Sequence, residues 1–89
     1  MKSVTITVFG KVQGVFYRAN TKEQAERLHL KGYVKNQANG SVYIEASGNS
    51  ENIKQLVLWC HQGSEFSAVD RVEVVENELK VFENFEIRR

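Results

Sequence analysis

The sequence predicts an α+β fold of the ferredoxin-like βαββαβ type, with two helices on one face of an antiparallel sheet. Segments in which apolar residues alternate with polar ones indicate strands, and two segments with helical spacing interrupt them. The elements follow in the order strand, helix, strand, strand, helix, strand, and an additional C-terminal strand follows them. A chain of 89 residues has room for one domain, so residues 1–89 are expected to form a single unit.

The first strand and the first helix are separated by a short segment rich in glycine. Residues 4–9 alternate in the manner of a strand, and a helix is predicted from about Tyr17 to Leu30. The apolar stripe of this helix is weak, so the helix is predicted partly from its neighbours. We expect Lys31-Gly32 to end it, because glycine readily takes the left-handed conformation found after helix C-termini.

A hairpin occupies the middle of the chain. Its strands are predicted at Tyr33–Gln37 and Ser41–Ser47, and Asn39-Gly40 between them is a strong hairpin signal. Polar residues at 48–50 then offer caps to a second helix. The apolar stripe of this helix consists of Ile53, Leu56, Val57 and Cys60.

Two further strands complete the predicted sheet. Gly63 ends the second helix, and Val69–Glu76 alternates as a strand. Asn77-Glu78 suits a turn, and Val81–Arg88 is predicted as the last strand. The sheet face that the helices leave uncovered is expected to be open or partly open.

Composition excludes several classes of protein. Twelve basic and eleven acidic residues give a formal charge of +1, which does not favour a nucleic-acid-binding surface. The single cysteine, Cys60, provides no disulfide framework and indicates a reducing compartment, the cytoplasm. No signal peptide or membrane-spanning segment is evident in the sequence.

The segment Gly10–Arg18 carries the first functional signal. Its two glycines allow a sharp turn whose main-chain N–H groups can converge on an anion. The N-terminus of the following helix adds positive partial charge at the same place. Arg18 in the first helical turn offers a planar set of donors for phosphate oxygens. Taken alone, such a loop is often only structural, and such an arginine is often only solvated.

Two motifs resemble the signatures of the acylphosphatase family. The first matches Gly-x-Val-Gln-Gly-Val followed by two residues and an arginine, from Gly10 to Arg18. The second matches a strand ending in Lys-Asn, a short turn and Gly-x-Val, within residues 32–42. Both occur in the expected order and separation, and the likeness continues to residues 85–87. The joint match is highly specific and implies the same ferredoxin-like fold.

The resemblance implies a metal-free, cofactor-free hydrolase of carboxyl phosphates. Arg18 resembles the family's phosphate-binding arginine, and Asn36 resembles the asparagine that orients the attacking water. The resemblance also implies a monomer whose site binds phosphate or sulfate. The phosphate-binding backbone would be that of Gln13, Gly14, Val15, Phe16, Tyr17 and Arg18.

Three departures from the family pattern accompany these matches. Phe16 stands where glycine is frequent, so we expect the loop to avoid left-handed torsions there. Tyr17 stands where phenylalanine is common and is expected to be tolerated. Residues 63–69 lack the prolines usual in the family, which questions the rigidity of this loop but not the chemistry.

An acyl phosphate needs little help to react, because its carboxylate leaving group is a weak base with a pKa of about 4 to 5. Phosphoryl transfer through a loose transition state depends mainly on positioning and charge stabilisation. Asn36 is no strong base, but its amide can both donate and accept hydrogen bonds to a water molecule. The sequence offers no obvious base, so we hypothesise that the proton passes to the substrate phosphate.

Other candidate residues have simpler interpretations. His29 and His61 show no metal-ligand spacing, and Cys60 is expected to be a small core residue rather than a nucleophile. Trp59 is expected to pack against its neighbours, and the glutamates at 73–86 to be solvated.

Two alternative functions remain open. A ferredoxin-like sheet can bind RNA through aromatic residues on its open face, where Tyr33, Tyr43 and Phe85 are candidates. The RNA-binding aromatic signature is missing, however, and the charge is nearly neutral. The other alternative is a carbamoyl-phosphate-handling domain of a larger maturation protein.

Overall fold

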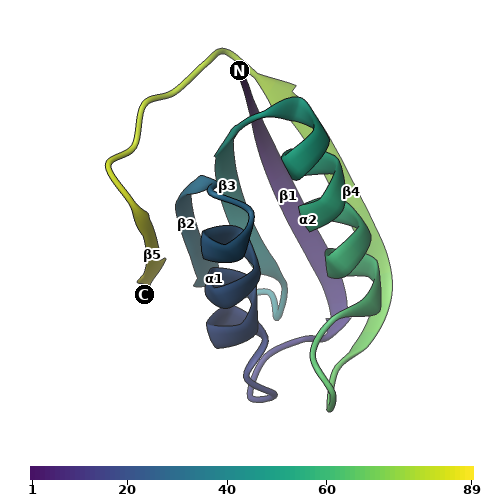
Figure 1. Cartoon of the computed structure of the whole chain (residues 1–89). Helices are drawn as coiled ribbons and strands as arrows, with labels where there is room; N and C mark the ends of the chain where they lie inside the picture. The colour runs from purple at the N-terminus through teal and green to yellow at the C-terminus, as the bar shows by residue number, and fades with distance from the viewer.

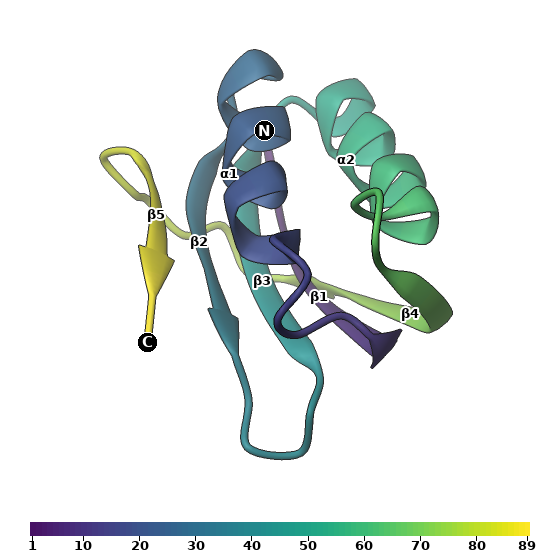
Figure 2. The ribbon, with the colours of Figure 1, turned by 90° about the horizontal axis from the view of Figure 1, so that it is seen from below.

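The computed structural model describes all 89 residues, which form five strands and two helices (Figure 1). The elements are β1 (Lys2–Lys11), α1 (Tyr17–Arg27), β2 (Lys31–Asn36), β3 (Val42–Gly48), α2 (Ser50–Gln62), β4 (Ala68–Asn77) and β5 (Phe85–Arg88). The strands make one sheet in the order β4-β1-β3-β2-β5. Figure 2 shows both helices on the same face of this sheet. The predicted ferredoxin-like α+β fold is confirmed.

The first four strands pair in antiparallel fashion, whereas the C-terminal strand does not. β1 lies between β3 and β4, and β2 pairs with β3. β5 pairs with β2 in parallel, so the complete sheet is mixed. The predicted last strand began at Val81, but pairing begins at Phe85. Residues 80–82 instead cross the face of the sheet that the helices leave uncovered, so they cannot pair at its edge.

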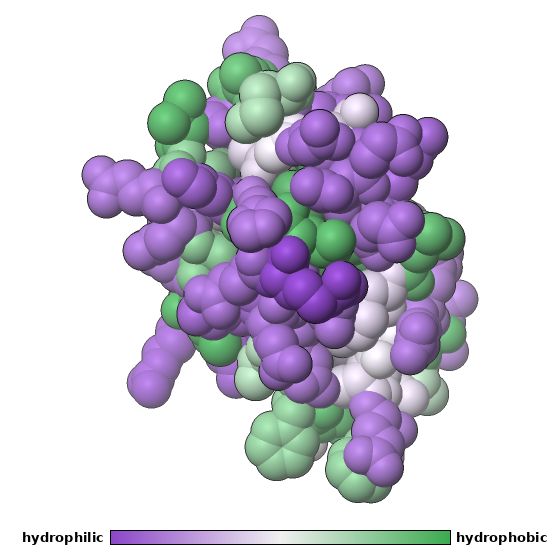
Figure 3. All heavy atoms as spheres, in the orientation of Figure 1, coloured by the Kyte–Doolittle hydropathy of each residue, from purple (hydrophilic) through white to green (hydrophobic).

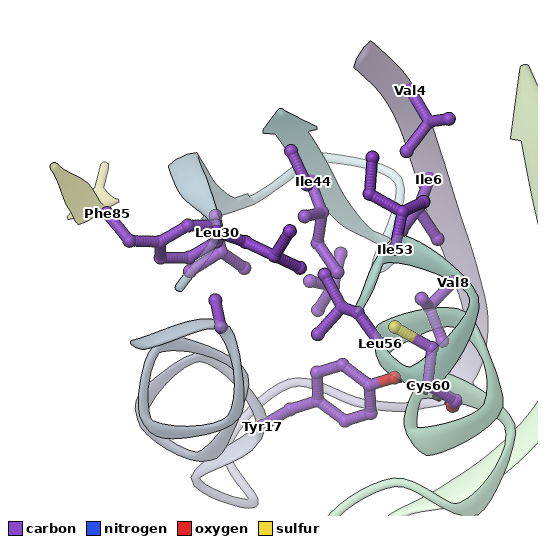
Figure 4. Close-up of a cluster of buried hydrophobic side chains, with 14 of the residues drawn as sticks. Val4, Ile6, Val8, Tyr17, Leu30, Ile44, Ile53, Leu56, Cys60 and Phe85 are labelled. Carbon is purple, nitrogen blue, oxygen red and sulfur yellow. Dashed lines mark hydrogen bonds between the residues drawn. The ribbon is translucent and has the colours of Figure 1, made fainter. Parts of the chain in front are cut away.

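The core lies between the sheet and the two helices (Figure 4). Residues of β1 and β3 at alternate positions, Ile6, Val8 and Ile44 among them, point toward the helices and are fully buried. Tyr17 reaches from the start of α1 to α2, where its hydroxyl donates to the carbonyl oxygen of Cys60 at 2.8 Å. The first turn of α1 is therefore anchored in the core.

Helix α1 ends earlier than the sequence predicted. The helix stops at Arg27, and His29 takes left-handed torsions with φ of 58°. The N–H of His29 bonds the carbonyl of Glu26, and the N–H of Leu30 bonds that of Ala25. This pair of bonds is a Schellman motif with histidine where glycine is usual. The prediction that Lys31-Gly32 ends the helix was wrong.

Gly32 has a different role, as a strand residue. It lies in β2 with φ of 146°, and a Cβ atom there would come within 1.9 Å of the carbonyl oxygen of Glu45 in β3. The glycine is therefore required by the close approach of two strands rather than by a helix end.

The sheet face opposite the helices carries a polar and aromatic cluster. Glu45 is 7% exposed and accepts hydrogen bonds from the hydroxyls of Tyr33 and Tyr43 and from Nζ of Lys80. Phe82 packs edge-on against Tyr33. Phe85, which was proposed for this face, is instead buried on the helix side at 3% exposure. The segment around residues 80–82 covers part of the face on which RNA would have to bind.

Neither helix is long and apolar enough to span a membrane. The structure also contains no group of three or more histidine, cysteine, aspartate or glutamate side chains placed to hold a metal ion.

Candidate active site

The loop between β1 and α1 presents unpaired main-chain donors. None of the N–H groups from Gln13 to Arg18 donates a hydrogen bond within the protein. Helix α1 begins without any side-chain cap, so the first N–H groups of the helix stay unsatisfied as well. Converging amides at a helix N-terminus favour an anion, because each N–H points its positive end outward.

Two left-handed residues shape this loop. Gly14 has φ of 73° and Phe16 has φ of 62° with ψ of 20°. The expectation that the loop avoids left-handed torsions at Phe16 was therefore wrong. A bulky residue in this conformation costs roughly 1 to 2 kcal/mol, because Cβ approaches the following carbonyl oxygen. The loop turns its amides outward in spite of this cost.

Two side chains fix the loop to its neighbours. Nε2 of Gln13 donates to the carbonyl oxygens of Gln37 at 2.7 Å and of Ser41 at 2.9 Å, in the β2–β3 hairpin. The hydroxyl of Ser64, which is buried after α2, donates to the carbonyl oxygen of Val15 at 2.8 Å. These bonds use the side chain of Gln13 and the carbonyl of Val15, and they leave the N–H groups of the loop unpaired.

The loop that lacks the family's prolines is held by serines instead. The hydroxyl and the N–H of Ser67 both bond the carbonyl oxygen of Ser64, at 2.8 and 3.1 Å. Ser64 in turn holds Val15. These hydrogen bonds connect the 63–69 loop to the 13–18 loop, and motif matching does not reveal them.

A cavity of about 280 Å³ opens at the end of the molecule where this loop lies. Its lining brings together residues from the loop, from α1, from the end of β2 and from β5. The polar part consists of Gly14, Arg18 and Asn36, and the apolar part of Val12, Phe16, Tyr17, Ala19 and Ile87.

Arg18 and Asn36, predicted from distant parts of the sequence, both line this cavity. Arg18 forms no ion pair with any carboxylate of the chain, so its charge is available to a ligand. The Oδ1 atom of Asn36 is buried and has no hydrogen-bond partner in the protein. Leaving such an acceptor unpaired costs about 1 to 3 kcal/mol, which a bound donor would recover.

Sequence reasoning included two residues that do not line the cavity and missed several that contribute to it. The Gln13 side chain binds the hairpin, and Val15 is 5% exposed in the core, so at most their N–H groups serve the site. Ile87 was missed because its contribution requires knowing that β5 lies beside β2. Ser64 was missed because no pattern connects residue 64 with residue 15.

The remaining reactive side chains lie apart from the cavity. Cys60 is fully buried, and burial raises the pKa of its thiol to about 12. A thiol that stays protonated is no nucleophile, so the interpretation as a core residue is confirmed. Trp59 packs against the ring of Tyr17 with a centroid separation of 5.1 Å, as expected.

The domain is an α+β sandwich of the ferredoxin-like class. Its cavity combines an uncapped helix start, an arginine without an ion pair and a buried amide oxygen without a partner, which suits an anionic ligand. The family model named Acylphosphatase matches residues 4–87. An acylphosphatase from Shewanella amazonensis is 42% identical over 88 residues, which cover 98% of this chain and 97% of that protein. One from Syntrophus aciditrophicus is 43% identical over 76 residues, covering 85% and 79%.

Solved structures agree. The crystal structure of acylphosphatase from Bacillus subtilis superposes with a TM-score of 0.97 at 34% identity, over 100% of both chains. A phosphate- and nucleotide-bound HypF matches with a TM-score of 0.89 at 28% identity, over 99% of this chain but only 12% of HypF. The chain belongs to the acylphosphatase family. It is an enzyme that hydrolyses acyl phosphates, and the RNA-binding alternative is not favoured.

Proposed function

We propose that the cavity between the 13–18 loop and β2 is the active site for this hydrolysis. The phosphoryl group of the substrate lies against the free N–H groups of residues 13–18, and the guanidinium of Arg18 neutralises its charge. The observation that carries the proposal is the set of unpaired amides beside an arginine that no carboxylate neutralises. An uncapped helix start of this kind suits an anion such as phosphate or sulfate.

Asn36 is proposed to hold the attacking water. Its buried Oδ1 lacks a donor, and a water molecule in the cavity can supply one. The water forms a bond to phosphorus as the bond from phosphorus to the carboxylate oxygen breaks. Because the carboxylate leaves without protonation and asparagine is no base, the water proton passes to a phosphate oxygen. The products are a carboxylate and inorganic phosphate.

This chemistry requires positioning rather than strong acid–base groups. A loose transition state spreads negative charge over the equatorial phosphoryl oxygens, and fixed amides with Arg18 are arranged to stabilise it. The hydrogen bonds from Gln13 and Ser64 fix those amides before substrate arrives. No metal or cofactor enters the proposed mechanism.

The remaining assignments are also proposals. We place residues 1–89 in a single acylphosphatase-like domain that acts as a monomer, since each subunit would carry a whole site. The single cysteine and the absence of a disulfide support a reducing, cytoplasmic location. Carbamoyl phosphate is included among the possible substrates, because it too joins a phosphoryl group to a carbonyl carbon through oxygen.

The test is hydrolysis of benzoyl phosphate with a chelator present, together with inhibition by inorganic phosphate. We expect turnover that the chelator does not affect and competitive inhibition by phosphate. Binding of a single-stranded RNA in moderate salt serves as the comparison. RNA binding without hydrolysis would overturn the proposal, and hydrolysis abolished by the chelator would overturn its metal-free character.

A further inference from the structure

The apolar part of the active-site cavity has no role in binding phosphate. Phe16 and Ile87 reach it from opposite ends of the chain, and Ala19 lies one helical position beyond Arg18. The amides and Arg18 suffice for the phosphoryl group. The apolar lining therefore faces whatever the phosphoryl group is attached to.

Phe16 is an unusual residue for its position. Its ring is 73% exposed, so little packing energy compensates for its left-handed torsions. The ring stacks on no other aromatic residue and lies under no cation. In many proteins, backbone strain of this kind is concentrated at functional sites. In Figure 3, apolar side chains project at the lower end of the view, where Figure 1 places the 12–16 loop.

Ile87 reaches the cavity through the additional strand. β5 pairs with β2 so that Val34 and Ile87 are register partners, and Phe85 on the same face is buried in the core. Ile87 is 43% exposed and lines the cavity. The parallel strand thus adds an aliphatic side chain near the polar site.

The charges in the cavity lining indicate which substrates the cavity excludes. Arg18 is the only charged side chain in its lining, and the phosphoryl group takes that charge. A second anionic group on the substrate would meet Phe16 and Ile87 and lose its water without gaining a partner. The cavity of about 280 Å³ lies just below the usual size range of small-molecule sites, so a long acyl chain would extend beyond it.

We propose that Phe16 and Ile87 form an acyl-binding wall that selects acyl phosphates with an uncharged, apolar acyl group. This inference rests on the proposed active site and names its substrate class. The wall acts by removing apolar surface of the acyl group from water, so it favours an aromatic or branched acyl group over acetyl or carbamoyl.

The experiment compares kcat/KM for benzoyl, 4-carboxybenzoyl and acetyl phosphate, each divided by its spontaneous hydrolysis rate. The wild-type protein is expected to prefer benzoyl phosphate over 4-carboxybenzoyl phosphate by roughly tenfold, since discrimination by apolar pockets spans about 10- to 200-fold. Equal values for these two substrates would overturn the exclusion of charge.

Two variants test the wall. Phe16→Asn removes the ring and keeps a residue that tolerates left-handed torsions, and Ile87→Thr keeps a β-branched residue in β5. Each is expected to lower the benzoyl-to-acetyl ratio of kcat/KM by roughly fivefold to tenfold. The ratio is independent of any general loss of activity, so a partly damaged variant remains informative.

Phe66→Asn is the matched control. Phe66 is 64% exposed, similar to Phe16, but it does not line the cavity. Its ratio is expected to equal that of wild type. Ratios within twofold of wild type in both Phe16→Asn and Ile87→Thr would overturn the wall. A protein that hydrolyses none of the three substrates would overturn the proposed function instead.

Discussion

The two helices begin in opposite ways. Helix α2 starts with Asn49, whose side chain accepts a hydrogen bond from the N–H of Glu51 at 2.9 Å. Glu51 also places a negative charge in its first turn. Helix α1 starts at Phe16 with left-handed torsions, no capping side chain and no acidic residue in its first turn. In Figure 1 these two helix starts lie at opposite ends of the molecule.

The difference separates stability from function. At α2 a side chain of the protein satisfies one of the orphan N–H groups, that of Glu51, which contributes to folding. At α1 the chain leaves them unsatisfied beside Arg18, which costs stability and creates an anion site. The functional helix start is thus identified by the absence of a capping side chain and of an acidic residue in its first turn. Changes at each start should therefore affect different measurements.

The largest expected effect follows from removing the charge at the α1 start. Arg18→Ala should lower kcat/KM for benzoyl phosphate by roughly 10³-fold or more and weaken phosphate inhibition, as loss of a charge-stabilising arginine does elsewhere. Arg27→Ala, at the other end of α1, is the control and should retain activity, because Arg27 hydrogen-bonds Gln24 and does not line the cavity. Unchanged phosphate inhibition in Arg18→Ala would contradict the proposed role.

Asn36 should affect turnover without affecting phosphate binding. Asn36→Ala should lower kcat by about 10²-fold, the scale of losing one positioned polar group, while phosphate inhibition stays within about twofold of wild type. Asn36→Asp keeps an acceptor oxygen but adds negative charge, so it should weaken phosphate inhibition as well. Equal loss of turnover and phosphate binding in Asn36→Ala would refute the water-positioning role.

Ser64 tests whether the free amides must be held in place. Ser64→Ala removes the hydrogen bond to Val15, so KM and the phosphate inhibition constant should rise about threefold to tenfold, as expected for one hydrogen bond. Ser64→Thr retains a hydroxyl and should recover most of the loss. Lowered stability with an unchanged inhibition constant would mean that Ser64 has only a structural role.

The smallest expected effect is at the α2 start. Asn49→Ala should lower the free energy of unfolding by about 1 kcal/mol, measured by urea denaturation. Kinetic constants should be those of wild type, because Asn49 lies at the end of the molecule away from the cavity. Any change in kcat would show that the two helix starts are not independent.

Much of the fold could be predicted because local patterns agree with tertiary structure. The Asn39-Gly40 turn and the capped start of α2 are local features, and the first four predicted strands lie within about two residues of the observed ones, whereas the last begins four residues later than predicted. The end of α1 could not be predicted, since His29 takes a conformation that glycine usually provides. That conformation depends on burying Leu30 in the core, which a local pattern does not contain.

The site residues that belong to a sequence motif could be predicted, and those that reach the site through tertiary packing could not. Arg18 and Asn36 follow from two motifs, and the structure brings them to one cavity. The left-handed torsions of Phe16 oppose its intrinsic preference, so sequence reasoning pointed the wrong way there. Ile87 and Ser64 depend on contacts between segments far apart in the chain, for which one sequence holds no local signal.

Glu45, on the sheet face opposite the helices, makes the stability of the protein depend on pH under acidic conditions. Burial acts to raise the pKa of this carboxyl, but hydrogen bonds from Lys80, Tyr33 and Tyr43 outweigh it and hold the pKa below its ordinary value. The stability it contributes is complete above the ordinary glutamate pKa and is lost as pH falls through the lowered pKa. Glu45→Gln should flatten that part of the pH–stability curve.

Lys80 lies in the segment that joins β4 to β5, and its bond to Glu45 attaches this segment to the sheet. Protonation of Glu45 should therefore weaken this attachment, on the face away from both helices.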